Sequence, residues 1–290
     1  MPELPEVETI ARTLAPQIEG ARVRGITVLL PKTLQCSTQL LPRLENALIE
    51  RVARRAKLLL LFARTADHPR AGNSPESELV LAFHLKMTGC FFVHPGGTAP
   101  LKHTRLIFDL ETRDGAAGRL FFDDMRTFGF CRVMQPGDLD DWPFWRTLGP
   151  EPLDGPPEAL AAHLATIFAT RRGAVKAALL DQEIVAGIGN IYADESLFKA
   201  GIRPGARACD ISGPRLLALA AALQEILLLS IRECGSSIRD YRDANGNAGA
   251  FQNSFAVYGR KDKACPSCGG LLEGTRIAGR GTVFCPRCQK

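Results

Sequence analysis

The sequence predicts an α+β protein: an N-terminal helix with a β-sandwich, then a helical domain that ends in a small metal-binding hairpin. Three observations predict this class. Short β-type runs recur up to about residue 135, apolar residues then follow helical spacing, and two cysteine pairs stand near the C-terminus. We expect a catalytic sandwich domain at 1–135, a Pro-, Gly- and Asp-rich linker at 136–157, a helical domain at 158–250 and a four-cysteine zinc finger at 251–290.

The N-terminal helix is predicted from Pro5, which fits a first helical turn, and from the apolar residues that follow at i, i+3 and i+4 spacing. Those residues are Val7, Ile10, Ala11, Leu14 and Ile18. Ahead of this helix lies a potential nucleophile. If Met1 is removed, Pro2 presents a secondary α-amine whose pKa of about 8 leaves part of it uncharged at neutral pH.

The helix entrance bears on the chemistry of that amine. Positive potential there should lower its pKa and should favour the carboxylates of Glu3 and Glu6. A secondary amine that attacks a sugar carbon forms an iminium, which is cationic without a proton and therefore withdraws electrons. On these residues alone a simpler alternative stands, in which Pro5 starts a helix and the two acids only complement its dipole.

Seven runs of β-forming residues predict the strands of the first domain, and the Gly and Asp turns between them favour a sandwich or barrel. The runs are Val23–Leu30, Lys57–Phe62, Leu79–Leu85, Cys90–Val93, Thr104–Leu110, Arg119–Phe122 and Phe128–Met134. We expect the stretch from Arg64 to Glu78 to be an exposed loop. Helical spacing then predicts helices over Leu160–Phe168, Val175–Leu180, Tyr192–Phe198 and Pro214–Ile231.

Composition places the chain among globular proteins. Of 290 residues 46% are hydrophobic and 23% charged, and no uninterrupted apolar run reaches membrane length. The N-terminus carries acids where a signal peptide would carry bases, so we expect a cytoplasmic protein without a membrane partner. Five single cysteines suit reduced thiols: Cys36, Cys90, Cys131, Cys209 and Cys234. The net charge of +5 permits a nucleic-acid partner.

Two CxxC pairs, Cys265 with Cys268 and Cys285 with Cys288, predict a structural zinc site. Their spacer falls within the roughly 15–20 residues typical of such sites. Four thiolates fill a tetrahedral zinc and leave no open position for catalysis. A redox or disulfide pair is the alternative. The zinc would hold a hairpin together, and a functional residue would lie between the two pairs.

Arg280 is the candidate between the pairs, because the flanking Gly279 and Gly281 let the backbone approach a ligand such as a phosphate closely. The alternative is a glycine turn that carries a solvated arginine. Asn190, in the sequence GIGN, is expected at the N-cap of a helix, where free N–H groups bind anions. An interhelical turn explains that stretch equally well.

Met87, Arg126 and Phe128 stand at strand ends next to glycine turns. Single Met and Phe residues are usually core, yet apolar wedges beside an arginine fill the space left by a flipped base in a duplex. Lys57 precedes four leucines, and by pattern alone it is a lysine that snorkels from the edge of an apolar strand.

Together these segments resemble bacterial formamidopyrimidine-DNA glycosylases, base-excision enzymes that remove oxidised purines such as 8-oxoguanine and then cut the strand. The similarity covers nearly the whole chain. It rests on PELPEVET, RRAKLLLL, HLKMTG, DMRTFG, LLDQEIVAGIGNIYADESLFKAGIRP and the terminal GRGTVFCPRCQ. It implies a helix-two-turns-helix DNA-binding domain at 158–250, one structural Zn²⁺, duplex DNA with a damaged base as partner, and a monomer that acts in the bacterial cytoplasm.

The resemblance implies a catalytic set of Pro2, Glu3, Glu6, Lys57 and Arg280, and a specific role for four of these residues. Pro2 would be the Schiff-base nucleophile on the anomeric carbon of the sugar, and Glu3 the acid that assists ring opening. Lys57 resembles the general acid/base of strand cleavage and a phosphate contact. Arg280 resembles the zinc-finger arginine of the second elimination, where a permanently charged guanidinium favours electrostatic stabilisation of the leaving phosphate.

The same resemblance implies the DNA-facing residues. DNA-contacting positions match His103, Arg126, Arg171, Lys176 and Asn190, and the wedge matches Met87, Arg126 and Phe128. Supporting carboxylates near the nucleophile match Glu6 and Glu195. Met125 and Thr127 depart from the DPRRFG element of the family, so the phosphate contact of its second arginine is not carried over. The stretch from Ser236 to Tyr241 resembles the start of the loop that covers the flipped purine.

Two rival functions stay open on the sequence. The related endonuclease VIII group prefers oxidised pyrimidines, but the PELPE start and the stretch near Ser236 favour the purine enzyme. A zinc-dependent protein that binds damaged DNA without cutting it is the second rival, and the intact set of Pro2, Glu3 and Lys57 argues against it. We therefore predict a bifunctional glycosylase and apurinic-site lyase.

Overall fold

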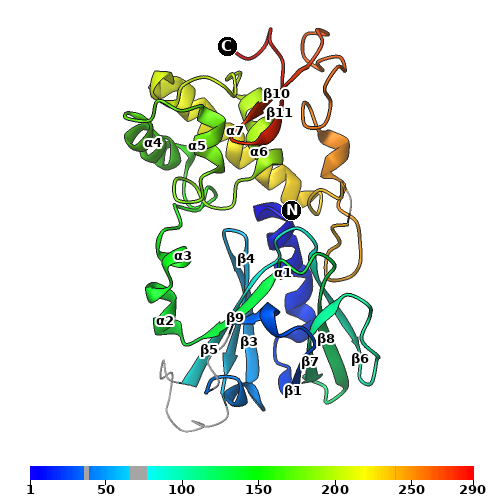
Figure 1. The fold of residues 1–290 in the computed structure, drawn as a ribbon. Helices are drawn as coiled ribbons and strands as arrows, with labels where there is room; N and C mark the ends of the chain where they lie inside the picture. The colour runs from blue at the N-terminus through cyan, green and yellow to red at the C-terminus, as the bar shows by residue number, and fades with distance from the viewer. Residues whose placement is uncertain (36–38, 66–76, 239) are drawn as a thin grey trace. The chain divides into compact units, whose positions relative to one another are not determined.

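The structure is a computed structural model that describes residues 1–35, 39–65, 77–238 and 240–290 (Figure 1). These residues form two compact units. Unit 1 comprises Met1–Arg146 and Cys234–Gly249, and unit 2 comprises Thr147–Glu233 and Ala250–Lys290. Cys36 and most of the loop expected between Arg64 and Glu78 lie outside the described residues.

The domain boundaries expected from the sequence stay a prediction. The two compact units divide the chain differently, since the first half of the expected linker, up to Arg146, belongs to unit 1. It also assigns 234–249 to unit 1, although this segment follows the helices of unit 2 in the chain.

The N-terminal helix α1 spans Leu4–Ile18, which confirms the predicted helix. Pro5 lies in its first turn, where a missing backbone N–H costs no hydrogen bond. Glu3 and Glu6 form a capping box, in which the Glu3 N–H donates to Glu6 Oε2 at 2.8 Å. Val7, Ile10 and Leu14 are fully buried, so the apolar stripe of α1 faces the core of unit 1.

The sheet of unit 1 contains nine strands among the described residues, in the order β2-β9-β5-β4-β3-β1-β7-β8-β6. Their bounds are β1 Arg22–Val28, β2 Leu34–Gln35, β3 Leu48–Arg55, β4 Leu58–Arg64, β5 Glu78–His84, β6 Gly89–Pro95, β7 Thr104–Glu111, β8 Ala117–Asp124 and β9 Phe130–Met134. All seven predicted strands are present. The sequence did not predict β2 and β3, because β2 is very short and β3 carries four charged residues.

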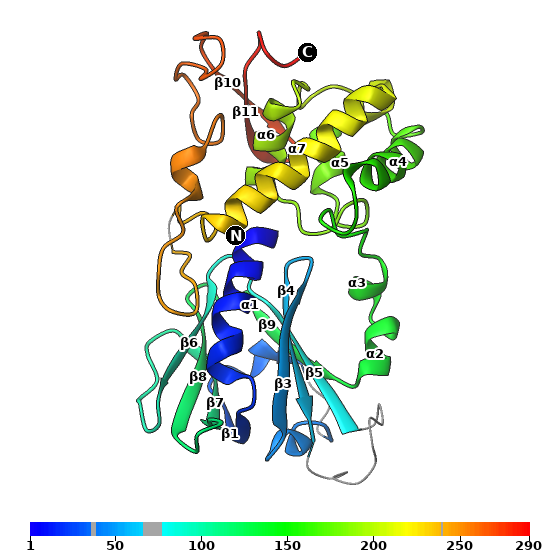
Figure 2. The ribbon, with the colours of Figure 1, turned by 180° about the vertical axis from the view of Figure 1, so that it is seen from behind.

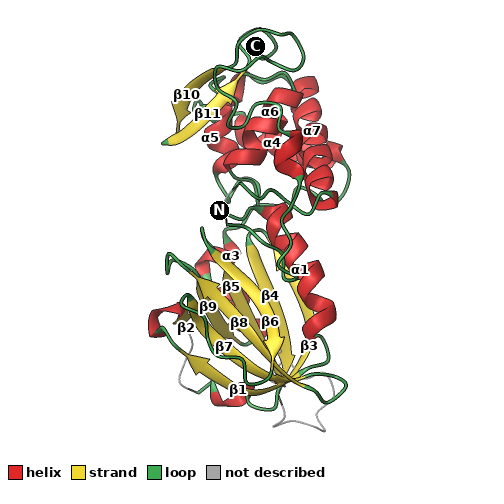
Figure 3. Ribbon diagram, turned by 90° about the vertical axis from the view of Figure 1, so that its right-hand side faces the viewer, coloured by secondary structure: helices red, strands yellow, loops and turns green. Residues whose placement is uncertain are grey.

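The sheet bends into the predicted sandwich at the junction of β1 and β3. Within the described chain these strands pair at one position, Arg22 with Leu48, which leaves a half that ends in β3 and a half that begins with β1. Phe83 of β5 packs against Phe91 and Phe122 of the other half, with ring centroids 4.9 and 5.5 Å apart. The two halves therefore share a core, and α1 packs against β3, β4 and β6 (Figures 2 and 3).

Two short helices, α2 (Pro136–Asp141) and α3 (Pro143–Arg146), occupy part of the stretch expected to be a linker. Trp142 is buried with Leu58, Leu60 and Val80 in a second apolar cluster, on the side chains of β4 and β5 that alternate with those of the main core. This cluster explains why the segment belongs to unit 1.

Unit 2 contains four helices of more than one turn among its described residues, and the zinc hairpin. The elements are α4 Pro157–Phe168, α5 Val175–Leu180, α6 Asn190–Lys199, α7 Gly213–Arg232, β10 Glu273–Ile277 and β11 Arg280–Phe284. All four predicted helices are present. One described helix, α7, is long and apolar enough to cross a membrane by length and composition. It packs against α4 and α6, and this burial accounts for its apolar face.

Candidate active site and nucleic-acid interface

The carboxylate of Glu6 bridges two backbone segments near the N-terminus, and we call this bridge the bracket of Glu6. Pro2 is buried and Glu3 is nearly so. The two carboxylate oxygens of Glu6 divide between backbone groups: Oε2 accepts from the Glu3 N–H at 2.8 Å, and Oε1 accepts from the Ser236 N–H at 2.9 Å. Glu6 therefore fixes the residue next to Pro2 and ties it to the segment 235–249.

The segment 235–249 has a closed stem. A Cβ atom on Gly249 would lie 2.1 Å from the Gly235 carbonyl oxygen, so only glycine fits this approach of two backbones. The Gly249 N–H donates to Ser237 Oγ at 2.9 Å, and Ser237 Oγ donates to the Tyr241 carbonyl at 2.8 Å. The predicted lesion-covering loop starts within this stem, and its Arg239 lies outside the described residues.

Lys57 lies at the tight turn between β3 and β4 and is 6% exposed. Ala56 takes a left-handed φ of 54° in this turn. Arg54 stabilises it by donating to the Ala56 carbonyl at 3.1 Å and to Glu8 of α1 at 2.9 Å. Burial opposes ionisation of Glu8, but hydrogen bonds from Arg54 and Arg12 outweigh it and lower the Glu8 pKa. The turn of Lys57 is thereby anchored to the N-terminal helix.

His84 is paired with Leu58 across β4 and β5, next to Lys57. Burial, with the charges of Lys86 and Lys57, lowers the pKa of His84 to about 3. The imidazole is therefore neutral at physiological pH. Its Nδ1 accepts the backbone N–H of Lys86 at 3.1 Å, which fixes the tautomer with the proton on the other nitrogen.

The residues predicted to form the wedge lie on two loops that Asp124 joins. The Asp124 carboxylate accepts from the Arg126 and Gly129 N–H groups at 3.2 and 2.7 Å, and from the Thr88 hydroxyl. Met87 and Phe128 are both exposed although they are large and apolar. Hydrogen bonds to Asp124 therefore hold two loops whose large apolar side chains are exposed to water.

Arg126 places a positive charge beside these exposed apolar side chains. Its guanidinium lies 5.2 Å from the centroid of the Phe128 ring. His103, another predicted DNA contact, lies at the base of the same loop, since its carbonyl accepts the Asp124 N–H at 2.9 Å.

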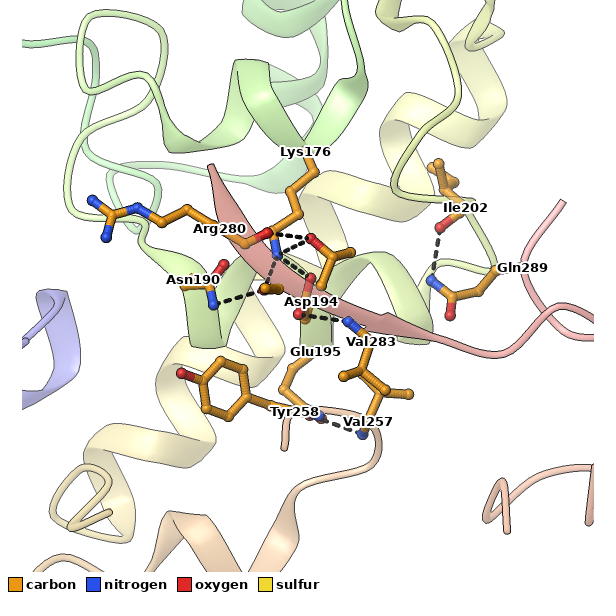
Figure 4. Close-up of polar contacts among 12 residues, drawn as sticks. Lys176, Asn190, Asp194, Glu195, Ile202, Val257, Tyr258, Arg280, Val283 and Gln289 are labelled. Carbon is orange, nitrogen blue, oxygen red and sulfur yellow. Dashed lines mark hydrogen bonds and ion pairs between the residues drawn. The ribbon is translucent and has the colours of Figure 1, made fainter. Parts of the chain in front are cut away.

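Lys176, predicted as a DNA contact, is fully buried in unit 2 (Figure 4). Its ammonium lies 2.7 Å from Asp194 Oδ1 and donates to Thr282 Oγ1 at 2.8 Å and to the Gly281 carbonyl at 3.1 Å. Asp194 in turn accepts the Val283 N–H at 3.2 Å, and burial raises its pKa to about 6. The pair ties α5 and α6 to β11, and the contact of Lys176 with DNA stays a prediction.

Asn190 and Arg280 lie next to the ion pair of Lys176 and Asp194, on α6 and β11 respectively. Asn190 Nδ2 donates to the Gly281 carbonyl at 3.0 Å. Gly189, one residue before, occupies the N-cap that we expected for Asn190, because the Asn190 side chain bonds the hairpin and not its own helix. Arg280 is exposed after a two-residue turn with φ of 47° and 71°, and Figure 4 shows its guanidinium directed away from Lys176.

A cavity of about 650 Å³ lies next to the ion pair of Lys176 and Asp194 in unit 2. It is lined by Asn190, Tyr258, Lys261, Arg276 and Gly281, among others. Two cations and an amide suit an anionic ligand.

Arg171 is also exposed and in unit 2, where it lies 3.4 Å from Asp181.

Glu195 is a buried anchor for the chain ahead of the zinc finger. Its carboxylate accepts three consecutive backbone N–H groups, at 2.9 Å from Ala256, 3.0 Å from Val257 and 2.7 Å from Tyr258. Burial raises its pKa, although these bonds and Arg260 act in the opposite direction. Its role as a carboxylate near the nucleophile stays a prediction.

The four cysteines of the zinc finger have the geometry of a tetrahedral metal site. Their Sγ atoms all lie within 4.8 Å of one another, with Cys265–Cys288 at 3.9 Å and Cys268–Cys285 at 3.5 Å. Zinc–sulfur bonds of about 2.3 Å require sulfur atoms about 3.8 Å apart. Gln289 supports the site, since it accepts the Cys285 N–H at 2.8 Å and donates to the Ile202 carbonyl at 2.8 Å. The residues therefore fit the predicted Zn²⁺.

Sequence reasoning missed the residues that hold these side chains in place. Asp194 follows Ala193 inside a helix and carries no spacing signal of its own. Arg54 and Asp124 read as surface charges, because their partners are distant in the chain. Adjacent acids on the buried side of a helix, as at Asp194 and Glu195, are the signal that could have identified Asp194.

Comparison with known proteins identifies the family of the chain. Residues 1–131 match the formamidopyrimidine-DNA glycosylase N-terminal domain, 148–242 match the H2TH domain of the same enzymes, and 262–290 match the zinc finger found in FPG and IleRS. A formamidopyrimidine-DNA glycosylase of Nitratidesulfovibrio vulgaris is 43% identical, with both chains covered in full.

Solved structures give the same result. A mutant of the Lactococcus lactis FPG protein, in complex with DNA containing Fapy-dG, is 31% identical, with a TM-score of 0.85 and both chains covered in full. The MutM (FPG) protein of Thermus thermophilus is 37% identical, with a TM-score of 0.82 over 99% of this chain and 98% of that one. In fold, in zinc ligands and over its whole length, the chain belongs to the formamidopyrimidine-DNA glycosylase family.

Proposed function

We propose that the chain is a bifunctional enzyme in which Pro2 excises the damaged base and the same covalent intermediate then cuts the strand. As a member of its family, the chain is a base-excision repair glycosylase that acts on oxidised purines in DNA. The lyase activity and the residue roles are our proposal. The observation that carries them is the bracket of Glu6, which holds Glu3 directly after Pro2 at the entrance of α1.

In the first step, the uncharged Pro2 nitrogen attacks C1′ of the damaged nucleotide once Met1 has been removed. The N-glycosidic bond breaks, the base leaves with the bonding electron pair and gains a proton, and the attacking nitrogen loses its own proton. Glu3 protonates O4′ as the sugar ring opens, which leaves an iminium between Pro2 and C1′. The proline nitrogen is secondary, so this iminium keeps its positive charge at any pH.

In the second step, the iminium withdraws electrons while a base removes a proton from C2′ and the C3′–O bond breaks, which releases the 3′ phosphate. A second elimination breaks the C5′–O bond and releases the 5′ phosphate. We assign Lys57 to proton transfer and phosphate contact, and Arg280 to stabilisation of the leaving phosphate. The solvent exposure of Arg280 and the anchored turn of Lys57 support these roles.

The DNA-facing side chains divide by role. We assign Met87, Arg126 and Phe128 to filling the space of the extruded base. His103, Arg171, Lys176 and Asn190 are assigned to the backbone, with Lys176 acting through the hairpin that it holds. Zinc, bound by the four cysteines, supplies no chemistry and keeps the hairpin of Arg280 folded. Every assigned residue comes from one chain, so we propose that a monomer acts on bacterial DNA in the cytoplasm.

Borohydride trapping tests this proposal. During reaction with an 8-oxoguanine duplex, borohydride should reduce the iminium and leave the protein covalently bound to DNA. Pro2→Gly should reduce the trapped fraction by at least about tenfold, since a primary amine forms an imine that needs a proton to withdraw electrons. Intact-mass analysis of the active enzyme should show that Met1 is absent.

Three outcomes contradict parts of the proposal. Unchanged trapping in Pro2→Gly would move the nucleophile to a lysine. Tight binding of damaged DNA by the wild type, with neither adduct nor cleavage, would favour a binding protein. Preferred trapping on an oxidised-pyrimidine duplex would favour the endonuclease VIII substrate class. Glu45→Gln, which alters an exposed carboxylate of unit 1 outside the proposed site, serves as the matched control.

A further inference from the structure

Lys32 makes a specific contact with the loop that carries the wedge. Its Nζ donates to Thr127 Oγ1 at 2.9 Å, in an exposed part of unit 1. Thr127 stands between Arg126 and Phe128, the cationic and aromatic residues of the wedge. The two partners are 95 residues apart in the chain, so the contact depends on the fold.

The backbone of Lys32 is fixed on both sides. It lies in the short 3₁₀ turn Pro31–Thr33, whose Thr33 is buried. The next residue, Leu34, begins β2 and pairs in parallel with Cys131 of β9, the strand that follows the wedge loop. The turn is therefore held against the same strand that leads out of the wedge, and the lysine side chain spans a short, defined gap.

Thr127 is an unusual residue for its backbone conformation. Its φ is 57°, in the left-handed region that β-branched side chains rarely adopt. The Thr127 hydroxyl accepts a hydrogen bond from the Lys32 ammonium. The turn Pro31–Thr33 therefore brings a cation to the loop that carries Arg126 and Phe128.

The charge of Lys32 has no carboxylate partner in the described part of the chain. Among those residues no Asp or Glu oxygen lies within 4.0 Å of its Nζ. Arg126, one residue from Thr127, is likewise exposed and faces an aromatic ring. Two cations that face no described carboxylate therefore lie at the loop that carries Phe128, and a phosphodiester is a ligand that this combination suits.

We propose that Lys32 is a further DNA-binding residue, which contacts a backbone phosphate of the duplex beside the wedge and is oriented by Thr127. This proposal depends on the proposed function in one respect, which is that Met87, Arg126 and Phe128 form the wedge. The contact is to phosphate and carries no information about the base, so it strengthens binding of damaged and undamaged duplex alike.

The test is the salt dependence of DNA binding. Lys32→Met should weaken binding about three- to tenfold at about 0.15 M salt, and should lower the slope of log K against log salt by about 0.9, the value for one lost phosphate contact. Both changes should be equal on a duplex with an abasic-site analogue and on undamaged duplex. Single-turnover excision with saturating enzyme should stay unchanged.

Three further variants isolate the contact. Thr127→Val keeps the branched shape but removes the acceptor, and should weaken binding in the same direction by a smaller factor. Lys32→Met with Thr127→Arg returns a cation to the loop and should restore the slope. Arg113→Met removes an exposed charge at the opposite end of β8 from Asp124, and should leave the slope unchanged.

Two results would overturn the proposal. The first is a Lys32→Met variant whose affinity and slope match those of Arg113→Met. The second is a Lys32→Met variant that binds normally but excises slowly. Thermal melting followed by tryptophan fluorescence separates misfolding from lost contact, and Thr127→Val decides the question if Lys32→Met is unstable. A wild type that binds but forms no borohydride adduct would contradict the proposed catalysis and leave this test valid.

Discussion

At the scale of single residues, His84 shows how burial sets a protonation state. It lies at the end of β5 and is 6% exposed. Burial, helped by the charges of Lys86 and Lys57, lowers its pKa to about 3, whereas an unfolded histidine titrates near 6.5. The unfolded chain therefore takes up a proton that the folded chain does not bind. The stability contributed by neutral His84 is complete above pH 6.5 and is lost as the pH falls toward 3.

We predict that unit 1 loses about 2 kcal/mol of unfolding free energy between pH 7.0 and 5.0 through this group, since each pH unit below 6.5 costs about 1.4 kcal/mol. His84→Asn, which keeps an acceptor for the Lys86 N–H, should flatten the pH dependence by that amount. Urea unfolding followed by the fluorescence of Trp142 and Trp145 measures it, because both tryptophans lie in unit 1. His163→Asn, in unit 2, is the control; equal pH dependence of His84→Asn and wild type would contradict the argument.

The sequence predicted single residues where chemistry imposes a local pattern. Four thiolates at CxxC spacing have one common explanation, and Pro2 with Glu3 and Glu6 lies within a single helical turn. It could not predict that Lys176 is buried, because its partner Thr282 is 106 residues away. Long-range partners decide whether a lysine faces water or a carboxylate, and such partners leave no periodicity in the sequence.

At the scale of elements, the Lys176–Asp194 pair joins two helices to one strand. Lys176 comes from α5, Asp194 from α6, and their hydrogen bonds end on Gly281, Thr282 and Val283 of β11. Arg280 begins the same strand. We therefore expect the position of the proposed phosphate-stabilising arginine to depend on this buried ion pair.

We predict that Lys176→Met destabilises unit 2 by about 3–5 kcal/mol, because it leaves a buried carboxylate without its cation. The double variant Lys176→Met with Asp194→Leu should cost less than the single one. Far-UV circular dichroism during urea unfolding measures this. Lys199→Met is the matched control: it breaks the exposed pair with Glu225 and should cost no more than about 1 kcal/mol.

A second measurement on the same variants separates positioning from stability. If the pair positions Arg280, the double variant should fold and still produce relatively more β-elimination product than β,δ-elimination product. A normal product ratio in a folded double variant would show that the Lys176–Asp194 pair is only structural. The single variant is less informative here, because its instability affects every step.

Elements were predicted well where one face is buried. The helices α4 to α7 and seven strands have clear periodicity. The strand β3 was missed because its three arginines and one glutamate interrupt any regular alternation of apolar residues. The helices α2 and α3 were missed because their Pro and Asp residues also signal a linker. Tertiary packing of Trp142, which no local pattern reports, decides the second case.

At the scale of the whole molecule, the two units carry different reporters. Both tryptophans belong to unit 1, and the four zinc ligands belong to unit 2. The metal can therefore be removed while the fold of the other unit is followed independently. The buried cluster around the zinc ligands is small, so we expect zinc binding to contribute much of the folding free energy of the hairpin.

We predict that Cys265→Ser loses zinc and DNA affinity together, while the tryptophan fluorescence and its melting temperature stay unchanged. Zinc content per chain, expected to be one in the wild type, and DNA binding are measured on the same samples. Cys209→Ser, a half-buried cysteine of unit 2 outside the zinc site, should keep both properties. Tight DNA binding by metal-free protein would contradict the coupling.

The glycine stem at Gly235 and Gly249 has a consequence for how this chain can diverge. Two backbones in direct contact fix both ends of the intervening segment, which itself belongs to unit 1. Between those ends Tyr241 donates to the Glu6 carbonyl at 3.3 Å, and the Ala244 N–H donates to the Thr13 hydroxyl at 3.1 Å. A change in length there would disturb the residues that hold the N-terminus, so we expect the segment to tolerate changes in composition better than changes in length.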